Sequence, residues 1–173
     1  IGTEANFDTT GAVLLQGSVN NVTLLNIDGA TGATFNGTVG ASVAGIIDIR
    51  QIDNGSTVAF NGNTSLEDLI TTAVNNYNIN FFGTTNQVNQ QVAFGNVGGT
   101  IQFGDDQFDT ILFSGGLVNP PGVASTRVAG TLSSGGLTSL SFDTLTVVEG
   151  SVATLETSGG DITIGTLTGE GGG

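Results

Sequence analysis

The sequence predicts an all-β protein, a right-handed parallel β-solenoid that carries one short amphipathic helix. Two observations support this prediction: short apolar runs that end at a glycine, and a phrase x-Phe-x-Gly that recurs along the chain. Short runs rich in β-branched and aromatic residues are typical of strands, and glycine lets the chain turn after each run. Strands this short favour stacked coils, whereas the alternative, a β-sandwich or jelly roll, usually has longer alternating strands.

The recurring phrase sets the expected length of a coil. Phe35 and Phe60 lie 25 residues apart, and Phe60 and Phe82 lie 22 apart, which is close to the length of one three-strand coil. We therefore expect phenylalanines from successive coils to stack inside the tube, with Asn and Thr in ladders at the corners.

The segment from Gln91 to Gly116 shows the strand-turn pattern most clearly. Three short apolar runs contain Phe94, Phe103 and Phe113, which are 9 and 10 residues apart, and each run is followed by glycine or Ser-Gly. This spacing fits one short strand plus one turn. The segment is thus interpreted as one module repeated three times.

One earlier strand has a clear inside and outside. In the segment from Gly45 to Ile52, Ile47, Ile49 and Ile52 are expected to share a buried face, with Asp48 and Arg50 on the other face.

The segment from Ser65 to Asn78 departs from the strand pattern. Its apolar residues recur at helical spacing, namely Leu66, Leu69, Ile70, Ala73, Val74 and Tyr77. Ser65 and Asp68 resemble a capping box with Asp in place of Glu. The pattern predicts one short amphipathic helix that covers an open end or a flank of the strand stack.

Composition excludes several classes of function. The chain has 2 Lys+Arg against 15 Asp+Glu, a formal net charge of -13, so phosphate backbones and anionic membranes would repel it. It has no Cys and no His, which removes thiol and imidazole nucleophiles, the Ser-His-Asp triad, zinc sites and disulfides. The remaining catalytic groups are carboxylates.

The chain is expected to form one domain over residues 1–170, followed by a flexible glycine tail at 171–173. Its apolar runs are too short for a transmembrane helix. The absence of an initiating Met indicates a segment cut from a longer precursor.

Several phrases resemble a known family. The stretches from Ile27 to Gly40, from Ile52 to Val58 and from Gly98 to Phe103 are similar to the passenger regions of rickettsial outer-membrane surface antigens, which are autotransporters. The resemblance implies a secreted β-solenoid displayed on the outer surface as an adhesin or a protective layer. The chain departs from that family in lacking lysine and a C-terminal membrane barrel, and the resemblance assigns no functional residue.

Two acidic groups are candidate sites. Asp105, Asp106 and Asp109 lie together just after a strand, where three carboxylates on one turn could bind calcium; the alternative is a solvated acidic turn, because the spacing matches no standard calcium loop. Asp48 and Asp53 flank Arg50, and a pair of carboxylates is what a glycosidase requires; the alternative is a surface ion pair between Arg50 and a neighbouring carboxylate.

Together these features predict a non-enzymatic structural or adhesive protein of the bacterial cell surface, either an autotransporter passenger fragment or a subunit of a self-assembling surface layer or extracellular filament. The expected partners are further copies of the chain, in a homo-oligomer or filament, and a host or neighbouring cell surface. Nucleic acid and membrane insertion by this segment are not expected, and no cofactor is expected apart from calcium. The alternative function is that of a carbohydrate-binding or polysaccharide-cleaving β protein.

Overall fold

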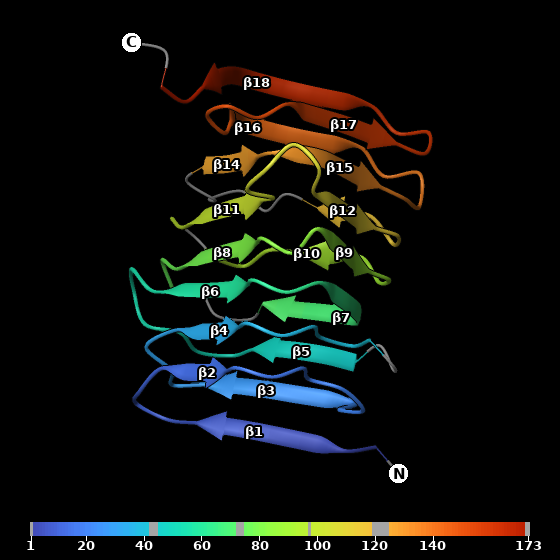
Figure 1. Ribbon diagram of the computed structural model, residues 1–173. Helices are drawn as coiled ribbons and strands as arrows, with labels where there is room; N and C mark the ends of the chain where they lie inside the picture. Colours follow the sequence, from blue (N-terminus) through green and yellow to red (C-terminus); the bar gives the residue numbers. More distant parts are fainter. Residues whose placement is uncertain (1, 42–44, 72–74, 97, 119–124, 172–173) are drawn as a thin grey trace.

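The chain folds into stacked parallel coils. The computed structural model describes residues 2–41, 45–71, 75–96, 98–118 and 125–171. The described residues form eighteen β-strands and no helix, and the strands pair in parallel from the N-terminal end to the C-terminal end (Figure 1). The predicted all-β parallel β-solenoid is confirmed.

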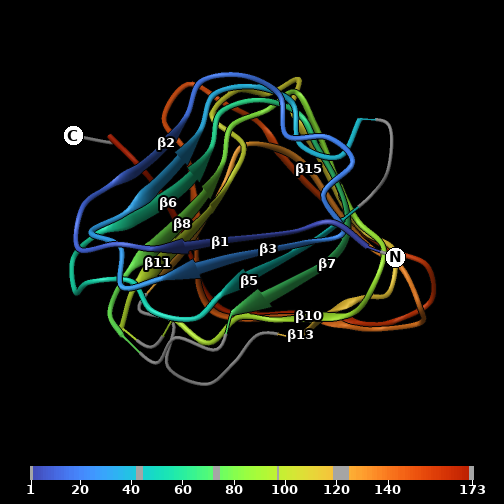
Figure 2. The ribbon, with the colours of Figure 1, turned by 90° about the horizontal axis from the view of Figure 1, so that it is seen from below.

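Each coil has three sides, so the stack is roughly triangular when viewed along its axis (Figure 2). The first face consists of β1 (Glu4–Asp8), β3 (Leu24–Asp28), β5 (Gly45–Ile49), the second half of β7 (Thr64–Thr71), β10 (Val92–Ala93) and β13 (Leu117–Val118). The second face consists of β2 (Val13–Leu15), β4 (Ala33–Phe35), β6 (Thr57–Phe60), β8 (Asn78–Phe81), β11 (Thr100–Phe103), β14 (Ser125–Val128), β16 (Leu140–Val147) and β18 (Ile162–Gly169). The third face consists of the first half of β7, β9 (Thr85–Val88), β12 (Thr110–Phe113), β15 (Gly130–Ser134) and β17 (Ala153–Thr157).

Strand β7 bends around a corner and joins the first and third faces into one hydrogen-bonded sheet. Its first residues, from Thr64 to Leu66, pair with β9, whereas the residues from Leu66 to Thr71 pair with β5. Beyond this corner the first face continues with β10, because the Thr71 hydroxyl donates a hydrogen bond to the Ala93 carbonyl at 3.1 Å.

The coil is right-handed. Viewed from the N-terminal end, the chain runs clockwise as it recedes (Figure 2), which is the hand that parallel crossover connections almost always take. Register partners are 20 residues apart between β1 and β3 and 25 apart between β9 and β12. The additional residues of the longer coils lie between the paired strands, at the corners, so the strands stay in register.

A column of phenylalanines fills the interior, as the sequence predicts. Phe35, Phe60 and Phe81 are register partners on the second face, and their rings stack with centroids 4.9 and 5.1 Å apart. Phe103 extends the column at 5.9 Å. Phe82 had been expected in this column, but it lies one residue too late; since side chains alternate along a strand, a shift of one residue turns Phe82 outwards.

The three phenylalanines of the central segment do not lie one above another. Phe94, Phe103 and Phe113 come from different sides of the coil and meet in the interior. The rings of Phe103 and Phe113 are 5.6 Å apart and edge-on, and those of Phe94 and Phe113 are 6.0 Å apart and edge-on. The interpretation of this segment as three copies of one module is therefore wrong: it is the successive sides of a coil.

The corner after the second face carries the expected asparagine ladder. The Asn36 side chain donates to Gln16 at 3.0 Å, and the Asn61 side chain donates to Asn36 at 2.8 Å. Gly37 and Gly62, which follow the two asparagines, lie directly against the backbone of the coil beneath. The x-Phe-x-Gly phrase thus combines an interior ring, an exposed ladder amide and a glycine at the close approach between coils.

The predicted helix over 65–78 is wrong where the structure describes it. Thr64–Thr71 is strand β7 in the middle of the stack, and Asn78 already belongs to β8; Ala73 and Val74 lie outside the described residues. The register between β5 and β7 shifts by one residue at Gly45/Ile46, where Glu67 is left unpaired. This irregularity turns both Leu66 and Leu69 inwards although they are three residues apart, which imitates helical spacing.

Both eight-stranded sheets, one from β1 to β17 and the other from β2 to β18, run from the first coil to the last, so the strands form one continuous stack. The last strand, β18, ends at Gly169. Of the expected glycine tail, Gly171 is described and exposed, and Gly172–173 lie outside the described residues.

Candidate functional site

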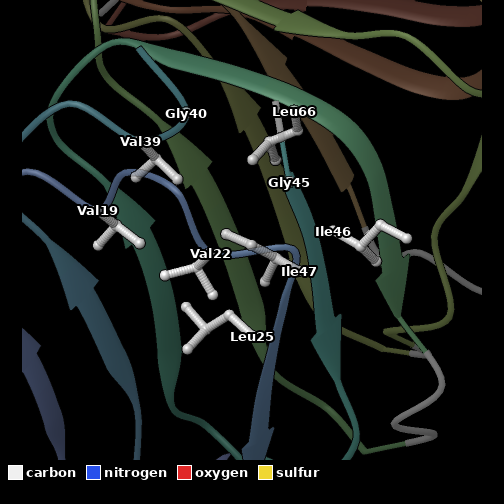
Figure 3. A pocket seen from close by; sticks show the side chains of 9 residues that line it. All are labelled: Val19, Val22, Leu25, Val39, Gly40, Gly45, Ile46, Ile47 and Leu66. Atoms are coloured by element: carbon white, nitrogen blue, oxygen red, sulfur yellow. The ribbon is translucent and has the colours of Figure 1, made fainter. Parts of the chain in front are cut away.

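The solenoid has a small apolar cavity at the corner between the third and first faces (Figure 3). Its volume is about 10 Å3, and it is lined by Val19, Val22, Leu25, Val39, Gly40, Gly45, Ile46, Ile47 and Leu66. All of these residues are aliphatic or glycine, so none of their side chains can donate a hydrogen bond or carry a charge. We interpret it as an imperfectly filled part of the core.

The predicted calcium ligands lie in the turn between β11 and β12. Asp109 is almost fully buried, and its Oδ2 accepts hydrogen bonds from the backbone N–H groups of Asp105 at 2.8 Å and Asp106 at 3.2 Å. Asp106 in turn accepts one from the Phe108 N–H at 2.6 Å. These carboxylates therefore hold the turn in shape, a structural use that asparagine and aspartate commonly have.

The side chains of this turn repel one another electrostatically. Burial, followed by the hydrogen bond and the charge of Asp109, raises the pKa of Asp105. Within the described part of the chain, no group of three or more acidic side chains is arranged to hold a metal ion. Calcium binding at Asp105, Asp106 and Asp109 stays a prediction.

A polar hollow of about 280 Å3 lies on the outer side of the first face, near the N-terminal end. It is lined by Asn6, Phe7, Asp8, Asn26, Asp28 and Arg50. Arg50 Nε donates to Asp48 Oδ2 at 2.8 Å, which confirms the expected ion pair, and this hydrogen bond is the main cause that raises the pKa of Arg50. Asp53 is exposed; its backbone N–H donates to the Ala30 carbonyl of the coil beneath at 3.1 Å, and its carbonyl accepts from the Ser56 N–H of the following turn at 3.2 Å.

A second polar hollow, of about 170 Å3, lies on the outer side of the second face. It is lined by Asn78, Asn80, Thr100, Gln102 and Arg127. Arg127 forms an ion pair with Glu170 at 2.5 Å, and the hydrogen bond from Arg127 is the main cause that lowers the pKa of Glu170. The hollow presents amide, hydroxyl and guanidinium groups side by side, a set that can bind hydroxyl or carboxylate groups of a ligand.

Sequence reasoning missed both polar hollows because their residues are distant in the chain. Asn6 and Asn26 become neighbours only through the pairing of β1 with β3, and Asn80, Gln102 and Arg127 only through two consecutive pairings on the second face. The signal that could have found them is the register: once one coil length is known, outward residues of successive coils can be placed in columns.

The two ends of the stack leave strand edges open. Among the described residues, β1 and β2 pair only with the coil above them, and β17 and β18 only with the coil below. Leu167 of β18 continues the column of the buried Leu145, yet it is 62% exposed. Open edges and exposed interior side chains of this kind can accept another parallel strand.

The fold and these surfaces define an open-ended, right-handed parallel β-solenoid whose flanks carry polar hollows, among them those at Arg50 and Arg127. The described residues include no helix that is long and apolar enough to cross a membrane. Comparison of the chain with protein-family models, with curated proteins and with solved structures found no match.

Proposed function

We propose that the chain is a non-enzymatic structural or adhesive component of a bacterial cell surface, as part of an autotransporter passenger or as a subunit of a self-assembling layer or filament. The observation that supports this proposal most is the open last coil, where Leu167 on β18 exposes an interior column to solvent. Another coil that pairs with β18 would bury this side chain and satisfy the open backbone groups.

In this proposal the chain acts mechanically, as a stiff rod. Every coil is hydrogen-bonded to the next through both eight-stranded sheets. The stacked rings from Phe35 to Phe103 fill the interior that the sheets enclose. Because the backbone groups of an inner strand are paired on both sides, bending the stack or inserting a protease requires several bonds to open together. Such a rod suits a role in which a surface is spaced, covered or bridged.

The charge distribution is compatible with a location outside the cell. The net charge is -13, and both cations are engaged in ion pairs, Arg50 with Asp48 and Arg127 with Glu170. The remaining carboxylates repel one another and keep the protein soluble, and they also oppose close approach to anionic membranes and nucleic acids. Partners would therefore be further copies of this chain or a surface that offers neutral or cationic groups.

End-to-end association is tested by sedimentation and electron microscopy over a range of protein concentrations. The unaltered chain is expected to form elongated oligomers, whereas Leu167→Lys should weaken association by at least about tenfold, because it would place an unpaired ammonium in the junction. Leu112→Lys is the matched control, since Leu112 also lies partly exposed on a strand but in the middle of the stack.

Two outcomes would contradict end-to-end association. One is a chain that stays monomeric at all accessible concentrations; the other is an equal loss of association in both lysine variants. A monomer that binds sugars would instead favour the alternative function, a carbohydrate-binding β protein. The hollow around Gln102 and Arg127 favours this alternative, because its polar groups match those that bind sugar hydroxyls.

A further inference from the structure

The first two coils repeat the pattern Asn-x-Asp on the same face. Asn6-Phe7-Asp8 lies in β1 and Asn26-Ile27-Asp28 lies in β3, and the register pairs Asn6 with Asn26 and Asp8 with Asp28. Neighbouring strands are about 4.8 Å apart, and alternate residues of one strand are about 6.7 Å apart on the same side. Two carboxylates and two amides therefore stand at the corners of a small rectangle on the outer side of the first face.

Negative charge in this rectangle exceeds the positive charge beside it. Asp8 and Asp28 are direct cross-strand neighbours, an arrangement in which like charges destabilise a sheet. Among the described residues that line the same hollow, Arg50 is the one cation; its Nε donates to Asp48, and its charge also interacts with Asp28. Asp8, Asp28 and Asp48 outnumber this one guanidinium, so the charge around the hollow stays negative.

The side chain of Asn26 gives an independent indication of a missing ligand. Asn26 is only 5% exposed and lines the hollow. Its Nδ2 donates to Asn6 Oδ1, but its buried Oδ1 has no hydrogen-bond partner among the described residues. A buried oxygen without a partner is unfavourable, and a cation is one group that can satisfy it.

We propose that this rectangle is a calcium site that bridges β1 and β3. Calcium takes about six to eight oxygen ligands in flexible geometry. The carboxylates of Asp8 and Asp28 would supply the charge, the Asn26 amide oxygen would supply a neutral ligand after a small side-chain rotation, and water would complete the shell. With only two carboxylates, the site would be of the weak type found in extracellular proteins.

The bound ion would fasten the first strand to the solenoid. β1 pairs on one side only among the described residues, with β3, so it is the strand most easily opened at this end. A calcium ion shared by Asp8 and Asp28 binds only while the two strands are together, and it therefore stabilises the closed state by linkage. This proposal depends neither on the proposed surface role nor on the separate acidic turn at Asp105, Asp106 and Asp109.

The test combines calcium calorimetry with hydrogen exchange of the β1 amides, on the whole chain at constant ionic strength. At a free calcium concentration ten times Kd, exchange of the β1 amides is expected to slow about tenfold. Asp8→Asn/Asp28→Asn should abolish this slowing and the calorimetric signal of one ion. Asp105→Asn/Asp106→Asn removes the same two charges elsewhere and should leave the slowing of the β1 amides unchanged.

The proposed site is overturned if calcium still slows exchange of the β1 amides in Asp8→Asn/Asp28→Asn. It is also overturned if calcium no longer slows this exchange in Asp105→Asn/Asp106→Asn. Equal slowing by sodium at matched ionic strength would mean an adventitious ion only, and would also overturn it. If the double variant fails to fold, the single variant Asp8→Asn supplies the same comparison, since Asp8 is exposed at the edge of the stack.

Discussion

Alanine at Gly62 is expected to lower the free energy of unfolding by about 3 kcal/mol, as overpacking against rigid atoms does, whereas alanine at Gly17 should change it by less than about 0.5 kcal/mol. A Cβ at Gly62 would lie 2.5 Å from the carbonyl oxygen and 2.6 Å from the carbonyl carbon of Gly37. These are backbone atoms of the coil beneath, so they cannot move aside without separating the two coils.

Gly17 is the matched control because it occupies the same corner in the first coil. A Cβ built there meets nothing within 4 Å, since no described coil lies beneath it, and its backbone φ is not positive. Denaturant unfolding followed by far-ultraviolet circular dichroism measures both variants. Equal tolerance of alanine at the two positions, or equal loss, would contradict the stacked corner.

Truncating Phe81 to alanine is expected to cost about 3 to 5 kcal/mol, the usual range for a fully buried phenylalanine. The Phe81 ring stacks between Phe60 and Phe103 at 5.1 and 5.9 Å, and it also meets Phe94 and Phe113 edge-on. Its loss would therefore open a cavity at the point where the three sides of the coil come together.

Phe82→Ala is the control for this prediction, because it removes the same atoms from the next residue. Phe82 follows the end of β8 and is only half-buried, so its truncation should cost about 1 kcal/mol or less. Thermal unfolding of the two variants gives the comparison. A larger loss for Phe82 than for Phe81 would mean that the register of the second face is displaced by one residue.

Much of the architecture could be predicted because each x-Phe-x-Gly phrase combines local and long-range requirements. The rings of Phe35 and Phe60 stack in the interior, and Gly37 and Gly62 stand where the backbones of two coils come too close for a side chain. Both features repeat once per coil. The Arg50–Asp48 ion pair could also be foreseen, since two residues of one strand at this spacing face the same side.

The errors came from features that only neighbouring coils determine. Leu66 and Leu69 have helical spacing because β7 carries an extra residue opposite β5, and a bulge has no signature in the apolar pattern of one segment. Phe81 and Phe82 are equally plausible core residues until β6 sets the register. The Asn-x-Asp rectangle needs the 20-residue offset of β1 and β3, which is shorter than the coil length that the phenylalanines suggest.

The most direct measurement of the stacked-coil architecture is a set of distances along one outward column of the second face. Leu14, Thr34, Ala59, Asn80, Gln102, Arg127 and Thr146 occupy successive coils of this column. The chain has no Cys, so cysteine pairs introduced there can carry spin labels without removing any native thiol.

Electron spin distances from Thr146 to labels at Ala59, Thr34 and Leu14 should rise in equal steps, through about 19, 24 and 29 Å, because each coil adds about 4.8 Å. Distances that do not increase in this order, as in two facing antiparallel layers, would contradict the stacked parallel coil on which the proposed rod and the calcium site both depend.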